Sequence, residues 1–469
     1  MNTETKASIL KAKIEKDFNA NKSLIFKNGS TFMNDIRSRA FERFCAIGFP
    51  DIKMEEWRFT NLAPVLSKDY SQHFTPPDSL FDLEKVFRCE VHDLDTYTVT
   101  QLNNWYAEKH IPLCHLPNGV IIGSLAKAME AHPDIIEKHF SKYTSFEDNG
   151  ITALNTAFAQ DGVFIFIPDG VEMDKPIQII SIIDAEENML VQPRNLIILG
   201  KNSKLSLVHC DHTIKHKSTL INTVSEIFLD EGSVMDHYKM QNKDNNSALI
   251  ATTCFHQEAN SQLTTNTIVL NGGLVRNNLN IKLNGRGSHA DLYGLYLVDK
   301  TQHMDNTTFV DHVAPETTSN ELYKGIVDDQ AHAVFSGKIL VRRDAQKVNA
   351  FQSNKNLLLT DEATVNTKPH LEIYADDVKC SHGATVGQMN PDEMFYLRSR
   401  GISEENARML LMYAFADEIV TKISVEALRQ RVCQLVSKRL KGELSICDQC
   451  VLHCNENKLP EFEIDMSKI

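Results

Sequence analysis

Between about Gly150 and Ala384 the chain is built from short runs in which apolar and polar residues alternate, and this pattern limits the fold more than any other feature. The runs are separated by Gly, Asn, Asp and Pro; examples are GVFIFIPDGV at 162–171, IQIISII at 177–183 and NTIVLNGG at 266–273. Alternation with a period of two, bounded by turn residues, is typical of β-strands. No amphipathic segment of helical length interrupts these runs. The pattern therefore predicts an all-β core rather than alternating βαβ units.

Several of the runs resemble one another, because each consists of a strand, a turn rich in Gly or Asn, and a second strand. The phrases LGKNSKL, LDEGSVM and LNGRGSHADLY show this similarity. An imperfect repeat of this kind favours a solenoid of stacked parallel strands, a β-helix, over a β-sandwich. Asn and Gly are expected at the corners, since both adopt left-handed backbone angles readily. The spacing of the repeat is irregular, so a sandwich is kept as the second choice.

Helical patterns flank the strand-rich core on both sides. On the N-terminal side, apolar residues recur at helical spacing from Phe32 to Phe44, before Gly48 and Pro50. On the C-terminal side, Asn390, Ser403 and Ser424 are candidate N-caps of three helices. We therefore divide the chain into an N-terminal helical or mixed region (1–145), a β-helix core (146–388), a C-terminal helical domain (389–442) and a cysteine-containing tail (443–469).

The segment PHLEIYADDVKCSHGATVG at 369–387 carries the most chemistry, at the point where strands give way to helices. Cys380 and His382 lie two residues apart, so in a strand both side chains leave from the same face. A thiolate and an imidazole are ligands that suit iron and zinc. Glu372, Asp376 and Asp377 lie close by in the sequence. Taken alone, however, the pair is better explained as a half-buried cysteine beside a hydrogen-bonded histidine.

The tail contains a second cysteine motif, CDQCVLHC at 447–454. The spacing of Cys447, Cys450 and Cys454 can hold zinc or an iron–sulfur cluster. A complete mononuclear site needs a fourth ligand, and His453 adjoins Cys454, which makes simultaneous ligation awkward. A metal site and a tail of reduced thiols are therefore equally compatible with the motif.

Charge and missing motifs exclude several classes of function. The formal net charge of −13 argues against a nucleic-acid surface or an anionic membrane as the main partner. The chain lacks a P-loop, a dinucleotide-binding fingerprint, a nucleophile elbow and an H-E-x-x-H motif, so no bound nucleotide and no catalytic site are expected. The first residues do not resemble a secretory signal, and no apolar run is long enough for a bilayer span, so we expect a cytoplasmic protein. In VHCDH (208–212) strand alternation predicts packing rather than a metal site.

Five phrases together resemble the SufB/SufD family of the Suf iron–sulfur cluster assembly system over essentially the whole chain. They are KMEEWRFTNL (53–62), LNTAFAQDGVFIFIPDGV (154–171), FSGKILVRRDAQKVNAFQSNKNLLL (335–359), the 369–387 segment and FYLRSRGI (395–402). SufB proteins share part of this pattern. The early EEWRFT-type segment and the form CSHGATVG favour the SufD branch.

The resemblance implies a right-handed β-helix between an N-terminal helical region and a C-terminal helical domain. It also implies a non-catalytic scaffold that pairs with SufB and docks the ABC-type ATPase SufC through its C-terminal helices. A transient iron–sulfur cluster would be shared with SufB, from sulfur delivered to SufB by a cysteine desulfurase system. By this resemblance His382 helps to ligate or position iron and Cys380 supports it, whereas Glu372, Asp376 and Asp377 are structural or support the ligands. Whether a flavin takes part is left open.

Two alternatives remain at this point. A homodimeric scaffold could work without SufB, because the partners are paralogous and the same strand edge could pair with a second copy. A β-helix carbohydrate-active enzyme is the less favoured alternative, because such enzymes present carboxylates and basic residues along one groove, and no such set recurs here from one repeat to the next.

Overall fold

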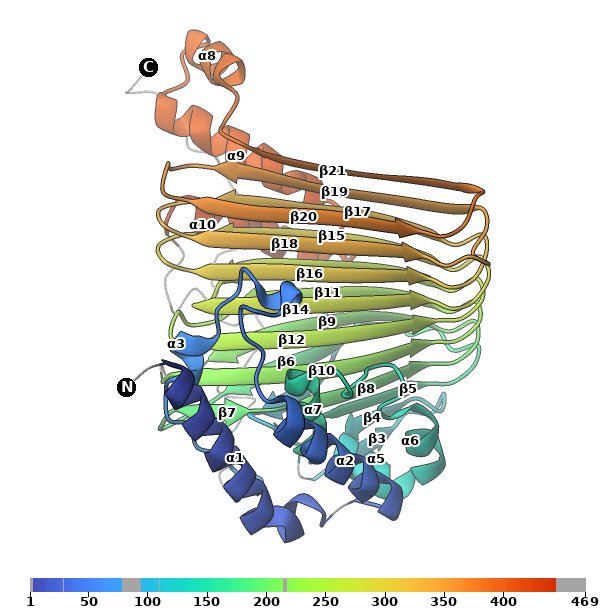
Figure 1. Cartoon of the computed structure of the whole chain (residues 1–469). Coiled ribbons are helices and arrows are strands. Elements are labelled where there is room, and N and C mark those ends of the chain that lie inside the picture. Colours follow the sequence, from blue (N-terminus) through green and yellow to red (C-terminus); the bar gives the residue numbers. More distant parts are fainter. Residues whose placement is uncertain (1–2, 28, 78–93, 109, 214–216, 444–469) are drawn as a thin grey trace.

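The core of the molecule is a parallel β-solenoid made of two facing sheets, which confirms the expected β-helix (Figure 1). The computed structural model describes residues 3–443 except 28, 78–93, 109 and 214–216. From Lys204 onward successive strands alternate between the two sheets, so each turn of the solenoid adds one strand to each sheet. We call these sheets A and B.

The strands of sheet A, in chain order, are β3 (Leu113–His115), β4 (Ile121–Ser124), β5 (Val163–Ile167), β7 (Met189–Val191), β8 (Arg194–Leu199), β10 (Thr219–Leu229), β12 (Ala248–Gln257), β14 (Leu274–Leu283), β16 (His303–His312), β18 (His332–Val341) and β20 (Thr364–Ile373). The strands of sheet B are β1 (Tyr97–Leu102), β2 (Trp105–Tyr106), β6 (Ile177–Ile183), β9 (Lys204–Thr213), β11 (Val234–Asn242), β13 (Gln262–Asn271), β15 (His289–Val298), β17 (Thr318–Val327), β19 (Val348–Leu358) and β21 (Val378–Gly387). The segment before residue 146 therefore contributes strands to both sheets as well as helices.

The corners of the solenoid explain the imperfect repeat in the sequence. Leu274, His303 and His332 are in register on successive strands of sheet A, so one turn takes 29 residues there. A residue with positive φ precedes each of several sheet B strands, at Asn202, Gly232, Asn260, Gly287 and Glu316. Asn and Gly at these corners were predicted. Glu316 occupies the same position at a higher conformational cost, and this relaxed residue choice is one reason why the repeat looks irregular.

Strand alternation separates an interior face from an exterior face on each sheet. In β9, Leu205 and Leu207 pack in the interior, whereas Val208 and Cys210 belong to the cluster outside sheet B. Asp211 also lies inside, where its carboxylate is 3.4 Å from Lys243 Nζ. The neighbours in VHCDH thus leave from opposite faces, as predicted.

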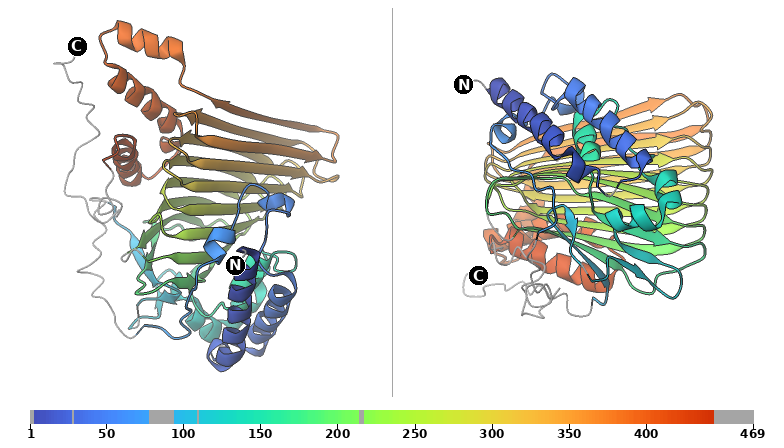
Figure 2. Two further views of the ribbon diagram at one scale, coloured as in Figure 1. Left: turned by 60° about the vertical axis from the view of Figure 1, so that its left-hand side comes forward. Right: turned by 90° about the horizontal axis from the view of Figure 1, so that it is seen from below.

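The N-terminal helices cover the first strands of sheet A on the outside. They are α1 (Thr3–Ile25), α2 (Thr31–Ile47), η1 (Glu55–Trp57), α3 (Ala63–Leu66), α5 (Leu125–Ala131), α6 (Pro133–His139) and α7 (Gly150–Ala157). Helix α2 begins after the N-cap Ser30 and ends at Gly48. Its buried face, including Phe44, packs against α7. The same apolar cluster includes Leu196 and Ile198 of β8. Viewed from below, these helices lie on the side of the solenoid opposite the C-terminal helices (Figure 2).

The C-terminal helices are α8 (Pro391–Ser399), α9 (Glu404–Val420) and α10 (Glu426–Leu440). Asn390 and Ser403 cap α8 and α9 as predicted. The prediction for Ser424 was wrong: α10 starts after Val425, and the Ser424 hydroxyl donates to Asp236 of β11 instead. Helices α9 and α10 pack against the exterior face of sheet B, whereas α8 projects beyond the last strands (Figures 1 and 2).

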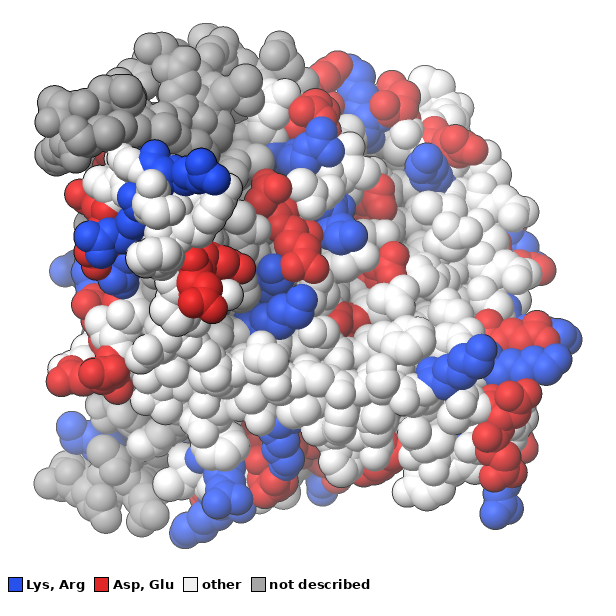
Figure 3. All heavy atoms as spheres, turned by 90° about the horizontal axis from the view of Figure 1, so that it is seen from above, with Lys and Arg blue, Asp and Glu red and all other residues white. Residues whose placement is uncertain are grey.

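The end of the solenoid that lies opposite the N-terminal strands is open. Strands β20 and β21 pair only with β18 and β19, so one side of each strand has no strand partner among the described residues. A view onto this end shows a band of uncharged side chains with charges of both signs beside it (Figure 3). Ile373, Tyr374 and Val386 are exposed there. Separately, none of the helices in the described part of the chain has both the length and the apolar character of a membrane span.

Candidate functional site

Cys380 and His382 lie on β21, the edge strand of sheet B at the open end. In register they stand next to Ala350 and Gln352 of β19, two residues whose side chains are buried inside the solenoid. Both therefore face the interior side of sheet B, as the two-residue spacing predicted. Their environment is the rim of the open solenoid rather than its closed core.

The two side chains differ in burial. Cys380 is half-buried and packs against the interior apolar cluster. Burial raises the pKa of its thiol, and a contact with the backbone of Ala350 offsets this only in part. At neutral pH Cys380 is accordingly a thiol and not a thiolate, which makes it a poor metal ligand in this state. The His382 side chain is exposed on the same face.

The three nearby carboxylates do not converge on this pair. Glu372 lies on β20 and points to the exterior of sheet A, where it contacts Lys338 Nζ at 2.8 Å and His370 Nε2 at 3.1 Å. These two contacts, Lys338 first, lower the pKa of Glu372. Asp376 and Asp377 lie in the turn between the two edge strands, where the Asp377 backbone is hydrogen-bonded to Gln346 and Lys347. All three positions are explained by local structure.

No group of three or more His, Cys, Asp or Glu side chains that could hold a metal ion occurs in the described part of the chain. Cys447, Cys450, Cys454 and the adjoining His453 lie outside the described residues. Cys380 and His382 therefore supply two donors at an open edge. Any iron held there needs further ligands.

The EEWRFT segment fastens the N-terminal region to sheet A. The Arg276 guanidinium on β14 lies over the Trp57 indole, 3.8 Å from the ring centroid, and is paired with Asp305 on β16 at 2.5 Å. Thr60 donates a hydrogen bond to the same carboxylate, and Glu55 is paired with Lys368 on β20. The motif that marked the family in the sequence thus has a structural role.

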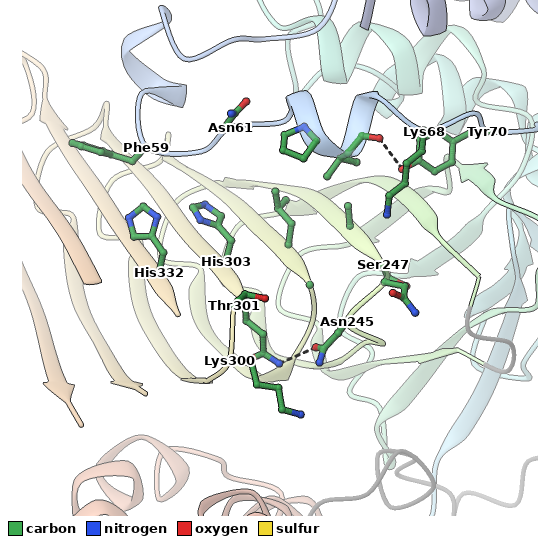
Figure 4. Close-up of a pocket in the computed structure, with 17 residues that line it drawn as sticks. Phe59, Asn61, Lys68, Tyr70, Asn245, Ser247, Lys300, Thr301, His303 and His332 are labelled. Atoms are coloured by element: carbon green, nitrogen blue, oxygen red, sulfur yellow. Dashed lines mark hydrogen bonds between the residues drawn. The ribbon is translucent and has the colours of Figure 1, made fainter. Parts of the chain in front are cut away.

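A pocket of about 430 Å³ lies beside this segment, between residues 59–70 and the loops that lead into sheet A strands (Figure 4). His303 and His332 form one wall, with ring centroids 4.9 Å apart. His303 is bonded to Thr60 at 2.9 Å and His332 to Asn366 at 2.6 Å. One ring nitrogen of each histidine is therefore engaged with the protein itself, and the pocket is separate from the open-end pair.

Sequence reasoning missed two buried polar residues that lie directly below His382. Gln352 on β19 is its register neighbour, and Glu321 on β17 is the register neighbour of Gln352. Both are buried, and Gln352 Nε2 donates to Glu321 Oε2 at 2.6 Å. Both positions alternate with exterior residues in strand-like runs, so strand parity could have placed them inside. Their alignment with His382 needed the register between strands.

Comparison with known families and proteins agrees with this architecture. Residues 181–415 match the family model "SUF system FeS cluster assembly, SufBD core domain", and residues 10–179 match "SufBD protein N-terminal region".

Three relatives show how far the similarity extends. An iron–sulfur cluster assembly SufBD family protein of Synechocystis sp. is 31% identical over 441 residues, which covers 91% of this chain and 96% of that protein. The iron–sulfur cluster assembly protein SufD of Escherichia coli is 42% identical over 176 residues, covering 38% of this chain and 42% of that one. SufD of Bacillus subtilis is 24% identical over 421 residues, covering 87% of this chain and 94% of that protein.

The family models cover both the helical N-terminal region and the solenoid, and the Synechocystis and Bacillus subtilis relatives match along most of the chain. These matches set aside the carbohydrate-active alternative. The chain belongs to the SufBD family of iron–sulfur cluster assembly proteins and is of the SufD type.

Proposed function

We propose that this chain is the SufD half of a SufB–SufD scaffold, and that a nascent iron–sulfur cluster forms where the open end of its solenoid meets SufB. The observation that carries the proposal is the position of Cys380 and His382 on an edge strand whose outer side has no strand partner in the described structure. An edge strand pairs readily with another chain. Two ligands at such an edge become a complete metal site only when a partner chain supplies the remaining ligands.

The roles of the two residues follow from their burial. His382 is exposed and an imidazole is a good iron ligand, so His382 holds or positions iron. Cys380 is held as a thiol by partial burial and supports the site until the interface reorganises. Exposure of Cys380 to water would remove the desolvation that raises its pKa and would favour the thiolate. The scaffold is not an enzyme in this proposal. The sulfur comes from a cysteine desulfurase system acting on SufB.

The energy for reorganisation would come from the ABC-type ATPase SufC, docked to the C-terminal helices. ATP-driven closure of two SufC subunits would pull on α8–α10 and shift the population of the SufB–SufD interface toward an open state. Helix α8 suits docking, because it projects from the solenoid and exposes Phe395 (74%) and Tyr396 (57%). Exposed aromatic side chains of this kind are frequent at protein interfaces.

Replacement of His382 by alanine tests the assignment of the site. We expect cluster formation on the complex with SufB and SufC to fall about tenfold or more, the loss typical of a disturbed metal site. Cluster yield is followed by visible absorbance and by iron and sulfide content. The matched control is H370A, since His370 is also exposed near the open end but on the exterior of sheet A. Equal cluster yields in H382A and wild type would refute the role of His382.

The docking surface is tested by the double variant F395S/Y396S. Both side chains are exposed, so the fold should be kept while affinity for SufC falls about tenfold or more, because buried aromatic anchors dominate protein interfaces. Binding is measured by titration calorimetry with purified SufC. Unchanged affinity would move the docking surface away from α8.

A homodimer is the second candidate, because β20 and β21 present the same unpaired edges to a further copy of this chain. Native mass spectrometry of the chain alone and mixed with SufB separates the two arrangements. If the homodimer persists in excess SufB, the heteromeric proposal fails.

A further inference from the structure

A column of side chains runs down the interior of sheet B from the open end. His382 on β21, Gln352 on β19, Glu321 on β17 and Leu292 on β15 are in register on successive strands. In a parallel sheet such neighbours share one face and lie about 4.8 Å apart. The column thus leads from the exposed imidazole to a buried carboxyl group two strands below.

The middle of this column is built to hold one orientation of the Gln352 carboxamide. Its Nε2 donates to Glu321 Oε2 at 2.6 Å, so the amide oxygen faces the other way. That Oε1 atom is buried and has no hydrogen-bond partner in the described structure. Gly337 on β18 leaves the space for the carboxamide, because a Cβ at this position would collide with it. A buried acceptor without a donor is costly, which points to a donor that turns toward this atom in another state of the protein.

On the open-end side of Gln352 along sheet B, its register neighbour is His382, one strand away. We infer that His382 donates one ring N–H to Gln352 Oε1 while Gln352 donates to Glu321. These two linked hydrogen bonds turn the other ring nitrogen of His382 outward, with its lone pair free. Gln352 and Glu321 are then positioning residues for iron binding. The inference rests on the proposed role of His382.

Glu321 suits the lower end of such a chain. It is fully buried without an ion-pair partner among the described residues, and burial raises its pKa to about 7, opposed by contacts with Thr308 and Gln352. The side chains that face it are Leu292, Tyr323, Thr308 and Gln352, and of these only Tyr323 titrates, with a pKa well above 10. An ionised Glu321 polarises the amide and strengthens the hydrogen bond to the imidazole. Ligating histidines are commonly held in this way by an acceptor on the second ring nitrogen.

The experiment compares Q352L and E321Q with E372Q in the complex with SufB and SufC. The control Glu372 is a carboxylate at the same end but outside sheet A. Iron retained by the complex should fall about 10–100-fold in Q352L and several-fold in E321Q, and stay unchanged in E372Q. In a high-resolution structure of the wild-type complex, a ring nitrogen of His382 should lie within about 3.2 Å of Gln352 Oε1.

A role in folding alone predicts a different pattern. E321Q removes a carboxyl group that resists ionisation, so its melting temperature should rise relative to that of wild type as pH increases from about 4.5 to about 7, while iron retention falls. Parallel changes in stability and retention would overturn the inference. So would wild-type retention in Q352L, or a His382 ring bonded elsewhere in the complex. H382A could leave the cluster yield intact while the wild-type structure shows His382 hydrogen-bonded to Gln352. In that case the proposed function fails, but the hydrogen bonds from His382 through Gln352 to Glu321 are confirmed.

Discussion

Replacing Glu226 with alanine should lower the free energy of unfolding by about 3–5 kcal/mol, since it removes one partner of a buried ion pair. Glu226 on β10 and Arg194 on β8 are both 0% exposed, with Arg194 Nη2 2.5 Å from Glu226 Oε2. The same carboxylate accepts hydrogen bonds from the backbone N–H groups of Ser141, Tyr143 and Thr144, at 2.8–3.2 Å. It therefore joins sheet A to the loop that follows α6. Without it a cation and three N–H groups lose their partner at once.

Urea denaturation followed by circular dichroism measures this loss as a lower midpoint with an unchanged slope. The control is E258A, because Glu258 is a partly exposed carboxylate at a strand end that contacts His256 and Asn284. Its replacement should cost about 1 kcal/mol or less. The double variant R194M/E226L should recover only part of the stability, since it leaves no charge unpaired but still leaves the three backbone N–H groups without an acceptor. A loss below about 1 kcal/mol in E226A would contradict this account of the contact.

Deleting all residues after Asn390 should make the protein insoluble. Helices α9 and α10 cover a strip of apolar side chains outside sheet B, comprising Tyr238, Met240, Ile268, Leu270, Leu295, Leu297 and Ile326. Each buried side chain of this size contributes about 1.5–3 kcal/mol, so the strip amounts to roughly 10 kcal/mol or more. This is comparable with the whole net stability of a typical domain.

Sedimentation and binding of an apolar fluorescent dye report the exposed strip. The control is F395S/Y396S, which alters the projecting α8 and leaves α9 and α10 in place, so it should remain soluble. A soluble, monomeric deletion product that does not bind the dye would show that the helices are dispensable for folding. The expected result also means that deletion is a poor test of docking, whereas substitutions on α8 keep the fold.

The solenoid could be predicted from the sequence because its cause is local. Period-two alternation and turn residues such as Asn202 and Gly232 act within a few positions of the chain. The common face of Cys380 and His382 was predictable for the same reason. The helix start at Ser424 was not, because the Ser424 hydroxyl meets Asp236, a residue 188 positions earlier.

The neighbours of the site also depend on contacts that the sequence order does not reveal. Glu372 is only eight positions from Cys380, yet it lies on the other sheet and points outward. Gln352 is 30 positions from His382 and lies next to it. Which of these residues is the neighbour depends on how many residues each turn of the solenoid takes, and that number varies from turn to turn. Proximity in sequence therefore does not bring Glu372 beside Cys380, and it gives no sign of the register that aligns Gln352 and Glu321 with His382.

The two ends of the solenoid are unlike each other, and this difference sets an upper limit on assembly. At the start, the antiparallel strands β2, β3 and β4 and the N-terminal helices interrupt parallel stacking, so no further turn can be added there. Among the described residues, only the β20–β21 end presents edge strands of the regular parallel stack. Two molecules of this kind, identical or paralogous, can meet end to end through their β20–β21 ends. That contact occupies the one open end of each molecule, so the product is a dimer. Each molecule thus offers one binding end along the solenoid axis, so it can pair with a partner without forming a fibre.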